Sequence, residues 1–130
     1  MSGPILIIED DPDIVDVLRY VLQSREYPTR IALNGIEGLM ASMDQAELPS
    51  LILLDMLLPE MNGIEICRRL RREKSTRGIP IIMVTAKASE ADFANAMAVG
   101  VDDYITKPFS VRTLLERVDL LLKRVQELAD

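Results

Sequence analysis

Four apolar stretches of the chain end in side chains that can do chemistry. In chain order these side chains are Glu9 with Asp10, Asp55, Thr85 and Lys107. Carboxylates brought close together repel one another, and a hard divalent cation such as Mg²⁺ relieves the repulsion while it keeps several of its waters. A phosphoryl group entering such a site can contact the cation, the Lys107 ammonium and the Thr85 hydroxyl. Asp55 would then be the nucleophile, and an acyl phosphate would form on it.

The apolar stretches have the length and composition of buried strands, and helical patterns alternate with them. The sequence predicts strands at residues 4–8, 29–33, 51–54, 80–86 and 101–106, and helices at 12–22, 35–43, 64–73, 90–99 and about 110–128. This alternation predicts an α/β fold, a doubly wound five-stranded parallel sheet with helices on both faces. Because the carboxyl ends of parallel strands share one edge, the candidate side chains are expected to meet there.

Local signals support the first and last helices. Asp11 followed by Pro12 is typical of a helix start, where the carboxylate caps the first turn. The residues expected on the buried face of this helix are Ile14, Val17, Leu18, Val21 and Leu22. The final helix carries Val111, Leu114, Val118, Leu121, Val125 and Leu128 at spacings of three and four, with Leu115 and Leu122 beside them. This spacing continues almost to Asp130 and is compatible with a helix that leads into a linker.

Length, charge and composition narrow the function classes. A chain of 130 residues, 48% of them hydrophobic, predicts one domain over residues 1–130. The net charge of −6 argues against a direct nucleic-acid partner. With one cysteine, no apolar run long enough for a membrane span and no secretory signal, the chain is expected to be cytoplasmic, with no membrane partner. The absence of histidine excludes Ser/His/Asp and Cys/His catalysis.

The pattern resembles the receiver domain of two-component response regulators over essentially the whole chain. The resemblance is carried by Glu9-Asp10, by Asp55 in LILLDMLLPEMNG, by Thr85-Ala86 in PIIMVTA, and by Tyr104 and Lys107 in DDYITKPF. It implies a flavodoxin-like fold with strand order 2-1-3-4-5 and a cis bond between Lys107 and Pro108. It also implies phosphorelay signalling, in which the phosphohistidine of a sensor histidine kinase or a phosphotransfer protein donates to Asp55 and an output domain or protein responds.

The same resemblance implies roles for individual residues. Asp10, Asp55 and the backbone carbonyl of Leu57 would hold Mg²⁺, with Glu9 acting through a water. Thr85 and Tyr104 would be the switch pair, which remodels the face made by the fourth helix, the fifth strand and the fifth helix. The chain would then be a phosphoacceptor switch that catalyses its own phosphotransfer and dephosphorylation, and not an enzyme in the usual sense.

In the winged-helix subfamily that the C-terminal segment resembles, activated copies pair through this face by charged residues. The charges available for such a homodimer are Asp102, Asp103, Arg112 and Arg117. The usual basic residue on the fourth helix is replaced by Phe93, and its acidic partner on the fifth helix by Thr113. The residues of this chain therefore depart from the pattern that supports a dimer held by symmetric salt bridges.

A second class of protein also fits part of the sequence. Asp11 and Asp13 after a hydrophobic strand loosely resemble the nucleophile motif of haloacid-dehalogenase-type phosphatases. The later residues that could be fitted to that family are Thr85, Lys87 and Asp102-Asp103. This alternative leaves Asp55 without a role and assigns catalysis to residues that already explain a helix start. A flavin-binding electron carrier is less well supported, because the loop after the first strand is acidic and lacks glycine.

Overall fold

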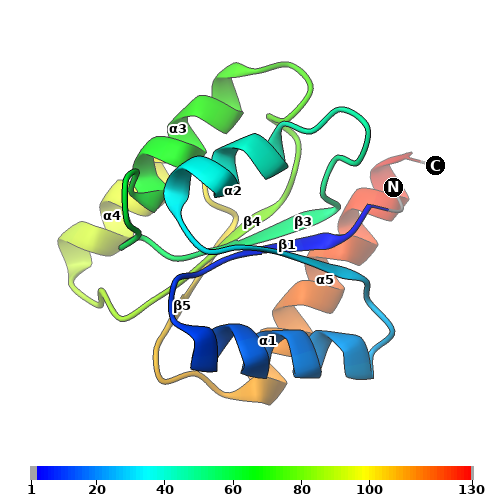
Figure 1. The fold of residues 1–130 in the computed structure, drawn as a ribbon, viewed down its shortest axis with the longest axis horizontal. Coiled ribbons are helices and arrows are strands. Elements are labelled where there is room, and N and C mark those ends of the chain that lie inside the picture. Colours follow the sequence, from blue (N-terminus) through cyan, green and yellow to red (C-terminus); the bar gives the residue numbers. More distant parts are fainter. Residues whose placement is uncertain (1–2, 130) are drawn as a thin grey trace.

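The computed structural model describes the backbone of residues 3–129 and the side chains of residues 3–125. Within this range the strands are β1 (Ile5–Ile8), β2 (Thr29–Ala32), β3 (Leu51–Leu54), β4 (Ile81–Thr85) and β5 (Asp103–Thr106). The helices are α1 (Pro12–Ser24), α2 (Gly35–Ser42), α3 (Gly63–Arg72), α4 (Glu90–Val99) and α5 (Val111–Ala129). All strand pairs are parallel, and the order is β2-β1-β3-β4-β5 (Figure 1), which confirms the predicted sheet.

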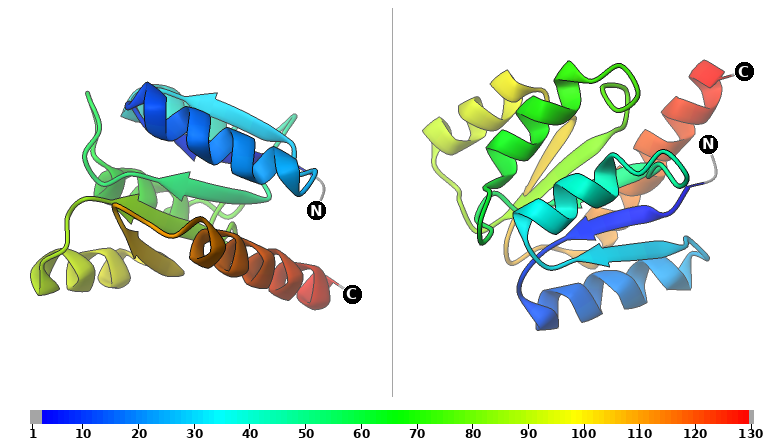
Figure 2. Two further views of the ribbon diagram at one scale, coloured as in Figure 1. Left: turned by 90° about the horizontal axis from the view of Figure 1, so that it is seen from below. Right: turned by 45° about the horizontal axis from the view of Figure 1, so that its top comes forward.

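Two layers of helices enclose the sheet, with α2, α3 and α4 on one face and α1 and α5 on the other (Figures 1 and 2). Successive residues of a strand point to opposite faces, so each strand contributes to both cores. In β1, Leu6 and Ile8 join the core under α2 and α3, whereas Ile5 and Ile7 join the core under α1 and α5. Burial on both faces therefore explains the continuous apolar runs of the central strands.

Side-chain caps fix where the helices begin. Asp11, Asn34, Asn62 and Ser89 each accept a hydrogen bond from a backbone N–H in the first turn of α1, α2, α3 and α4. These bonds satisfy N–H groups that have no partner within the helix. α4 ends at Gly100, whose φ of 101° is left-handed, a conformation that glycine adopts without strain. The predicted helix starts at Asp11-Pro12 and the predicted stop at Gly100 are both confirmed.

Several predicted details were wrong. Val17 is 43% exposed, and Val15 is buried instead. The buried residues of α1 centre on Leu18 and Leu22, and at about 100° per residue Val17 falls at the border of that stripe. Val111 is also 43% exposed, at the first turn of α5. β5 begins at Asp103, two residues later than predicted, and Leu128 lies outside the described side chains.

Arg71 ties three segments together at the amino end of the sheet. Its guanidinium donates to the carbonyls of Gly100 (3.0 Å) and Ile79 (2.7 Å) and to the carboxylate of Asp102 (3.0 Å). The ends of α3 and α4 and the start of β4 are therefore held by one side chain. Because a carbonyl at a helix end has no partner within the helix, these bonds also satisfy backbone groups that would otherwise lack one.

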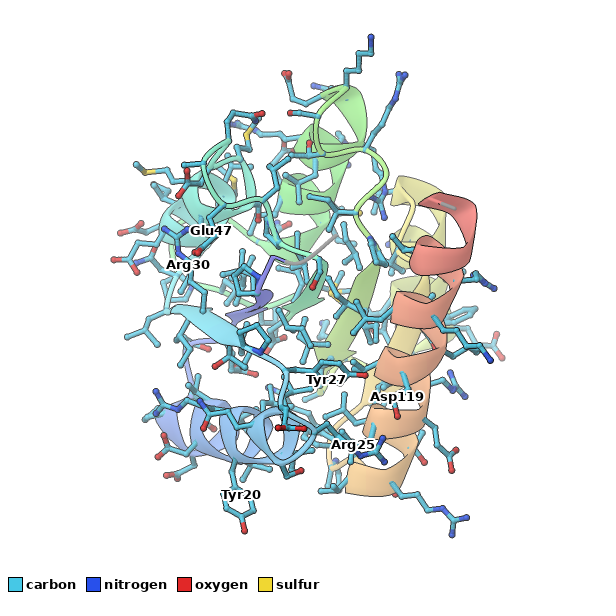
Figure 3. All side chains as sticks on the ribbon, turned by 90° about the vertical axis from the view of Figure 1, so that its right-hand side faces the viewer. Tyr20, Arg25, Tyr27, Arg30, Glu47 and Asp119 are labelled. Carbon is cyan, nitrogen blue, oxygen red and sulfur yellow. The ribbon has the colours of Figure 1, made fainter. Side chains whose placement is uncertain are left out.

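A second tie joins the turn after α1 to α5 (Figure 3). The Tyr27 hydroxyl and the Arg25 guanidinium both donate to the Asp119 carboxylate. Burial, followed by the bond to Asp119, raises the pKa of Tyr27 to about 12.

Among the described helices, none combines the length and the hydropathy that a membrane span requires.

Gly63 is required where the loop after β3 meets α3. Its N–H donates to the Met56 carbonyl (2.9 Å), and a Cβ added to it would lie 2.3 Å from the carbonyl oxygen of Asp55. Gly63→Ala should therefore push this loop away and lower the free energy of unfolding by about 1–3 kcal/mol. Urea denaturation followed by circular dichroism measures the loss. The matched control is Gly78→Ala, since nothing lies within 4 Å of a Cβ there; equal losses would contradict the prediction.

The Tyr27 bond should give a pH-dependent stability. The raised pKa means that the neutral phenol is favoured in the folded chain, so its contribution is complete below pH 10 and is lost as the pH approaches about 12. Tyr27→Phe should lower the free energy of unfolding by about 1 kcal/mol at neutral pH. The difference from wild type should shrink above pH 10, in denaturation curves measured at several pH values. A difference that grows with pH would contradict this assignment.

Candidate functional site

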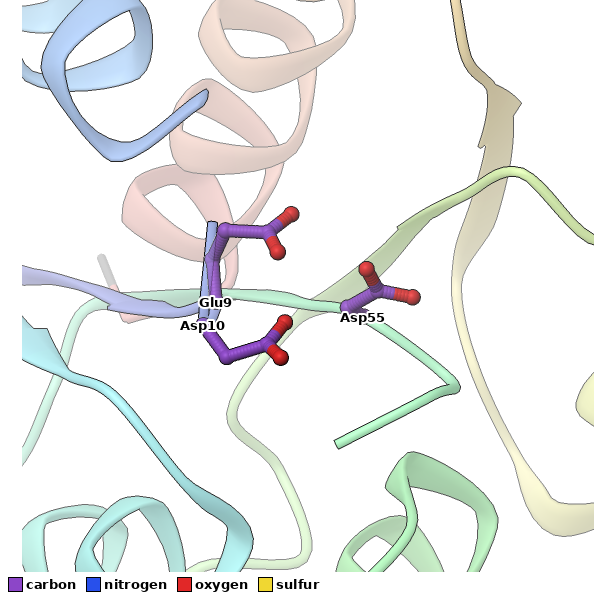
Figure 4. Close-up of side chains that lie close together, drawn as sticks. All are labelled: Glu9, Asp10 and Asp55. Atoms are coloured by element: carbon purple, nitrogen blue, oxygen red, sulfur yellow. The ribbon is translucent and has the colours of Figure 1, made fainter. Parts of the chain in front are cut away.

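The ends of β1 and β3 bring three carboxylates together. Ile8 lies opposite Leu54 in the parallel register, so the residues that follow them, Glu9 and Asp55, leave the sheet side by side. Glu9, Asp10 and Asp55 each offer a carboxylate oxygen within 4.8 Å of the others. Figure 4 shows the three side chains close together. Glu9 is 2% exposed and Asp55 6% exposed, whereas Asp10 is exposed to solvent. The acidic cluster predicted from the strand ends is therefore present at the carboxyl edge of the sheet.

Lys107 joins this cluster from the end of β5. Its ammonium nitrogen lies 2.5 Å from Glu9 Oε1 and 2.8 Å from Asp55 Oδ2. Burying either carboxylate without a partner would cost several kcal/mol, and the ammonium offsets much of that cost. Three carboxylates against one ammonium leave two negative charges in excess. This excess suits a divalent cation, which prefers carboxylate oxygen as a ligand. The bond between Lys107 and Pro108 is cis, as predicted.

The electrostatics of the cluster follow from burial and from this ion pair. Burial raises the pKa of Glu9, the Asp55 charge adds to the increase, and the Lys107 hydrogen bond opposes it. For Lys107, burial lowers the pKa, but the hydrogen bonds to Asp55 and Glu9 outweigh burial and the net change is upward. The ammonium is therefore charged at neutral pH, and Glu9 retains a proton more readily than an exposed glutamate.

Asp55 is held by donors on both of its oxygens. Oδ1 accepts from the backbone N–H of Leu57 at 3.1 Å, and Oδ2 accepts from Lys107. Its own N–H donates to the Ile8 carbonyl, which continues the pairing of β3 with β1. The sequence prediction assigned the carbonyl of Leu57 to a metal and missed the bond that the Leu57 N–H makes to Asp55. The Leu57 side chain is exposed.

Thr85 and Tyr104 are linked through the backbone N–H and carbonyl of Lys87. The Thr85 side chain is fully buried, and its hydroxyl accepts from the Lys87 N–H at 3.3 Å. The Tyr104 hydroxyl donates to the Lys87 carbonyl, and the Tyr104 ring meets Phe93 edge-on with centroids 5.5 Å apart. Sequence reasoning singled out Thr85 and Tyr104 but missed both of these contacts. The Thr85 contact is local, two residues along the chain, and a hydroxyl that accepts from the second following N–H is a known turn pattern. The Tyr104 contacts join separate elements, so no spacing along the chain indicates them.

The residues proposed for a phosphatase site do not come together. Asp11 caps α1 through a bond from the Asp13 N–H, and both side chains are exposed. Asp102 accepts from the Ile81 N–H at the start of β4 and pairs with Arg71, so it lies at the amino end of the sheet. Thr85 lies at the opposite end of β4. The arrangement therefore does not support the haloacid-dehalogenase alternative.

The charges considered for a symmetric dimer are already paired within the chain. Arg117 lies 2.6 Å from Asp103, and Asp102 lies 3.0 Å from Arg71. Arg112 pairs with Glu116 one turn along α5. A salt-bridged pairing of two copies would have to exchange these contacts.

Comparison with known proteins places the chain in a family. Residues 5–119 match the family described as the response regulator receiver domain. The DNA-binding dual master transcriptional regulator RpaA of Synechocystis sp. is 40% identical over 124 residues, covering 95% of this chain and 51% of RpaA. The chain thus spans about half the length of the curated relatives it matches.

Solved structures agree with this family. A CheY-like response regulator receiver domain protein from Methanospirillum hungatei superposes with a TM-score of 0.89 at 32% identity, covering 98% of each chain. The receiver domain of a sensor histidine kinase from Pseudomonas aeruginosa, with a magnesium ion coordinated in its active site cleft, gives a TM-score of 0.84 at 29% identity, covering 95% of this chain and 99% of the other. With its flavodoxin-like sheet and its acidic cluster, the chain belongs to the response regulator receiver domain family of two-component systems.

Proposed function

We propose that Asp55 is the phosphoacceptor of this receiver domain. The observation that carries the proposal is the central position of Asp55, with one oxygen held by Lys107 and the other by the Leu57 N–H. During transfer, an Asp55 oxygen bonds to phosphorus while the phosphorus–nitrogen bond of a phosphohistidine breaks. The imidazole nitrogen keeps the electron pair and takes a proton from solvent. The chain supplies positioning and charge, which is the main protein contribution to phosphoryl transfer.

Lys107 and Thr85 would bind the transferred group. The Lys107 ammonium is already within hydrogen-bond distance of Asp55, so it can follow the charge onto the phosphoryl oxygens. The Thr85 hydroxyl ends the neighbouring strand β4 and gives up only one long bond, 3.3 Å, when it moves. Water attack on phosphorus reverses the modification, releases phosphate and restores the carboxylate. In this sense the domain catalyses its own phosphorylation and dephosphorylation.

The acidic cluster would hold Mg²⁺. Asp10, Asp55 and the Leu57 carbonyl are the proposed ligands, with Glu9 acting through a water. The fit rests on the two excess negative charges and on the close approach of the three carboxylates. When bound, the ion neutralises charge that develops on the phosphoryl oxygens. Lys107 holds the carboxylates of Glu9 and Asp55 in place beside the ion's site.

The response to phosphorylation would pass through Lys87 to the face made by α4, β5 and α5. Movement of the Thr85 hydroxyl toward the phosphoryl group releases the Lys87 N–H, and the Lys87 carbonyl holds the Tyr104 hydroxyl. The backbone of this one residue therefore contacts both the site and the tyrosine. Shifting such an equilibrium from about 1:99 to about 99:1 requires roughly 5.5 kcal/mol.

The partners follow from the family and from the length of the relatives. A sensor histidine kinase or phosphotransfer protein would supply the phosphoryl group in the cytoplasm. An output domain or separate protein would read the altered face. We take residues 1–130 as one receiver domain whose α5 leads toward a linker, and a homodimer through α4, β5 and α5 is one possible output contact. Neither direct nucleic-acid binding nor membrane binding is assigned to this domain.

Asp55→Asn should abolish phosphorylation, because the amide cannot form the acyl phosphate. Intact mass spectrometry after treatment with acetyl phosphate and Mg²⁺ should show one added phosphoryl group on wild type and none on the variant. Removal of Mg²⁺ by EDTA should also suppress the addition. Asp11→Asn is the matched control, since Asp11 caps α1 outside the cluster, and it should be labelled like wild type. Label retained by Asp55→Asn, or lost in Asp11→Asn, would overturn the assignment.

The switch predicts a second result. Beryllofluoride with Mg²⁺, which mimics a phosphoryl group on aspartate, should change amide NMR signals both near Asp55 and over residues 90–125. In Thr85→Ala the changes near Asp55 should persist, and those over 90–125 should be reduced, because the hydroxyl that links the two regions is missing. Thr29→Ala in β2 serves as the control for the same substitution. Unchanged signals over 90–125 in wild type would refute the proposed coupling.

A further inference from the structure

The outward face of α2 is largely apolar, although no described part of the chain covers it. The helix has the sequence GIEGLMAS, in which Glu37 is the sole charged residue. Ile36 is 45% exposed and Met40, one turn later on the same face, is 70% exposed. Leu33, just before the helix, is 51% exposed. Exposed apolar residues gathered on one element indicate an interaction surface, whereas single ones do not.

Hollows flank α2 on both sides, so that its outer residues form a ridge. The hollow toward α3, about 370 Å³, has Leu39 and Met43 on the α2 side and Arg69 and Arg72 on the α3 side. The hollow toward β2, about 540 Å³, includes Met40 among its lining residues. α2 and α3 lie side by side on the same face of the sheet (Figures 1 and 2). A partner side chain can therefore enter beside the ridge as well as lie across it.

The neighbouring part of α3 and the turn after it are strongly basic. Residues 68–77 contain six basic side chains and one acidic side chain, a net charge of +5 in a chain whose total is −6. Arg71 is turned inward, but Arg72, Lys74 and Arg77 are exposed, and no carboxylate of the described residues lies within 4.0 Å of their charged groups. Arg68 and Arg69 share the single carboxylate of Glu65. The remainder of the chain carries −11, so this surface is a local exception to its charge.

We propose that the α2 ridge and the basic end of α3 together form a docking surface for an acidic amphipathic helix of a partner protein. Leucine-like side chains of the partner would cover Ile36 and Met40, and its carboxylates would pair with Arg69 and Arg72 across the hollow. Methionine suits such a contact because its unbranched side chain adapts to different partners. α2 offers about 12 Å of ridge at 1.5 Å per residue, which fits two turns of a partner helix and a transient complex.

Two features favour a protein partner over nucleic acid. The ridge is apolar, whereas phosphate backbones select uninterrupted positive charge. Glu65 and Glu73 line the same hollow as the arginines, so its positive charge is interrupted, and a partner whose carboxylates are spaced to meet Arg69 and Arg72 fits it better than a continuous row of phosphates. The surface also goes beyond the proposed phosphorylation, because α3 begins beside Asp55 at Gly63 and carries its arginines toward the opposite edge of the sheet. Docking here does not require the aspartate to be phosphorylated.

Fluorescence anisotropy with a labelled synthetic helix, 16 residues of Glu and Leu in an amphipathic order, tests the proposal. The double variant Arg69→Glu, Arg72→Glu should weaken binding at least tenfold, and Met40→Asn should weaken it several-fold. The matched control Arg112→Glu, Lys123→Glu makes the same charge change on α5 and should stay within twofold of wild type. Thermal unfolding followed by circular dichroism checks that each variant is folded. The milder variant Arg72→Ala keeps the test valid should the double variant unfold.

Four outcomes would overturn the inference. The first is an equal loss of peptide binding in the control and test variants, and the second is equal binding of a scrambled peptide of the same composition. The third is tighter binding of a 16-base-pair DNA duplex at the same salt concentration. The fourth is no detectable peptide binding while sedimentation shows the chain pairing with itself through α2. None of these readouts depends on Asp55. Loss of the docking proposal therefore leaves the phosphoacceptor assignment unaffected, and loss of that assignment leaves the docking proposal unaffected.

Discussion

The bond from Lys107 to both Glu9 and Asp55 is the interaction on which the rest of the site depends. Two carboxylates that are almost fully buried and adjacent would be unstable without a nearby positive charge. The ammonium reaches them from the far side of β4, and only a parallel sheet that ends β1, β3 and β5 at one edge permits this reach. The strand order is therefore as much a condition of the chemistry as the residues themselves.

The same edge explains how a local chemical change can reach a distant surface. Thr85 sits at the end of the strand between Asp55 and Lys107, and its hydroxyl touches the Lys87 peptide rather than the core alone. The carbonyl of Lys87, in the next peptide group, accepts from the Tyr104 hydroxyl, and the Tyr104 ring contacts Phe93 on α4. Each step is a direct contact between named groups, so the coupling can be described contact by contact. A tyrosine with two positions, biased by the backbone of Lys87, is sufficient in principle.

Much of the fold could be predicted because its causes are local. Continuous apolar runs indicated strands buried on both faces, and Asp11-Pro12 and Gly100 marked helix ends through backbone hydrogen bonding and conformation. The gathering of Glu9, Asp10, Asp55 and Lys107 followed from topology alone. The rest depends on how helices are rotated and which residues meet across elements. Val17 and Val15 are both apolar, and only the packing of α1 against α5 and the sheet decides which is buried. Likewise, nothing along the chain indicates that Phe93 meets Tyr104 or that Leu57 contributes its N–H.

The hydrogen bonds of Arg71 to Gly100, Ile79 and Asp102 have a consequence for α4. This helix buries only Ala96 among its residues, so its attachment to the body is weak along most of its length. Its far end, at Gly100, is fastened by the Arg71 guanidinium, which also grips Ile79 and Asp102. A helix that is fastened at one end and has few buried residues elsewhere is expected to move least at the fastened end. We therefore expect any displacement of α4 to pivot about Arg71 and to be largest in the first turn of the helix, which follows Lys87 in the chain.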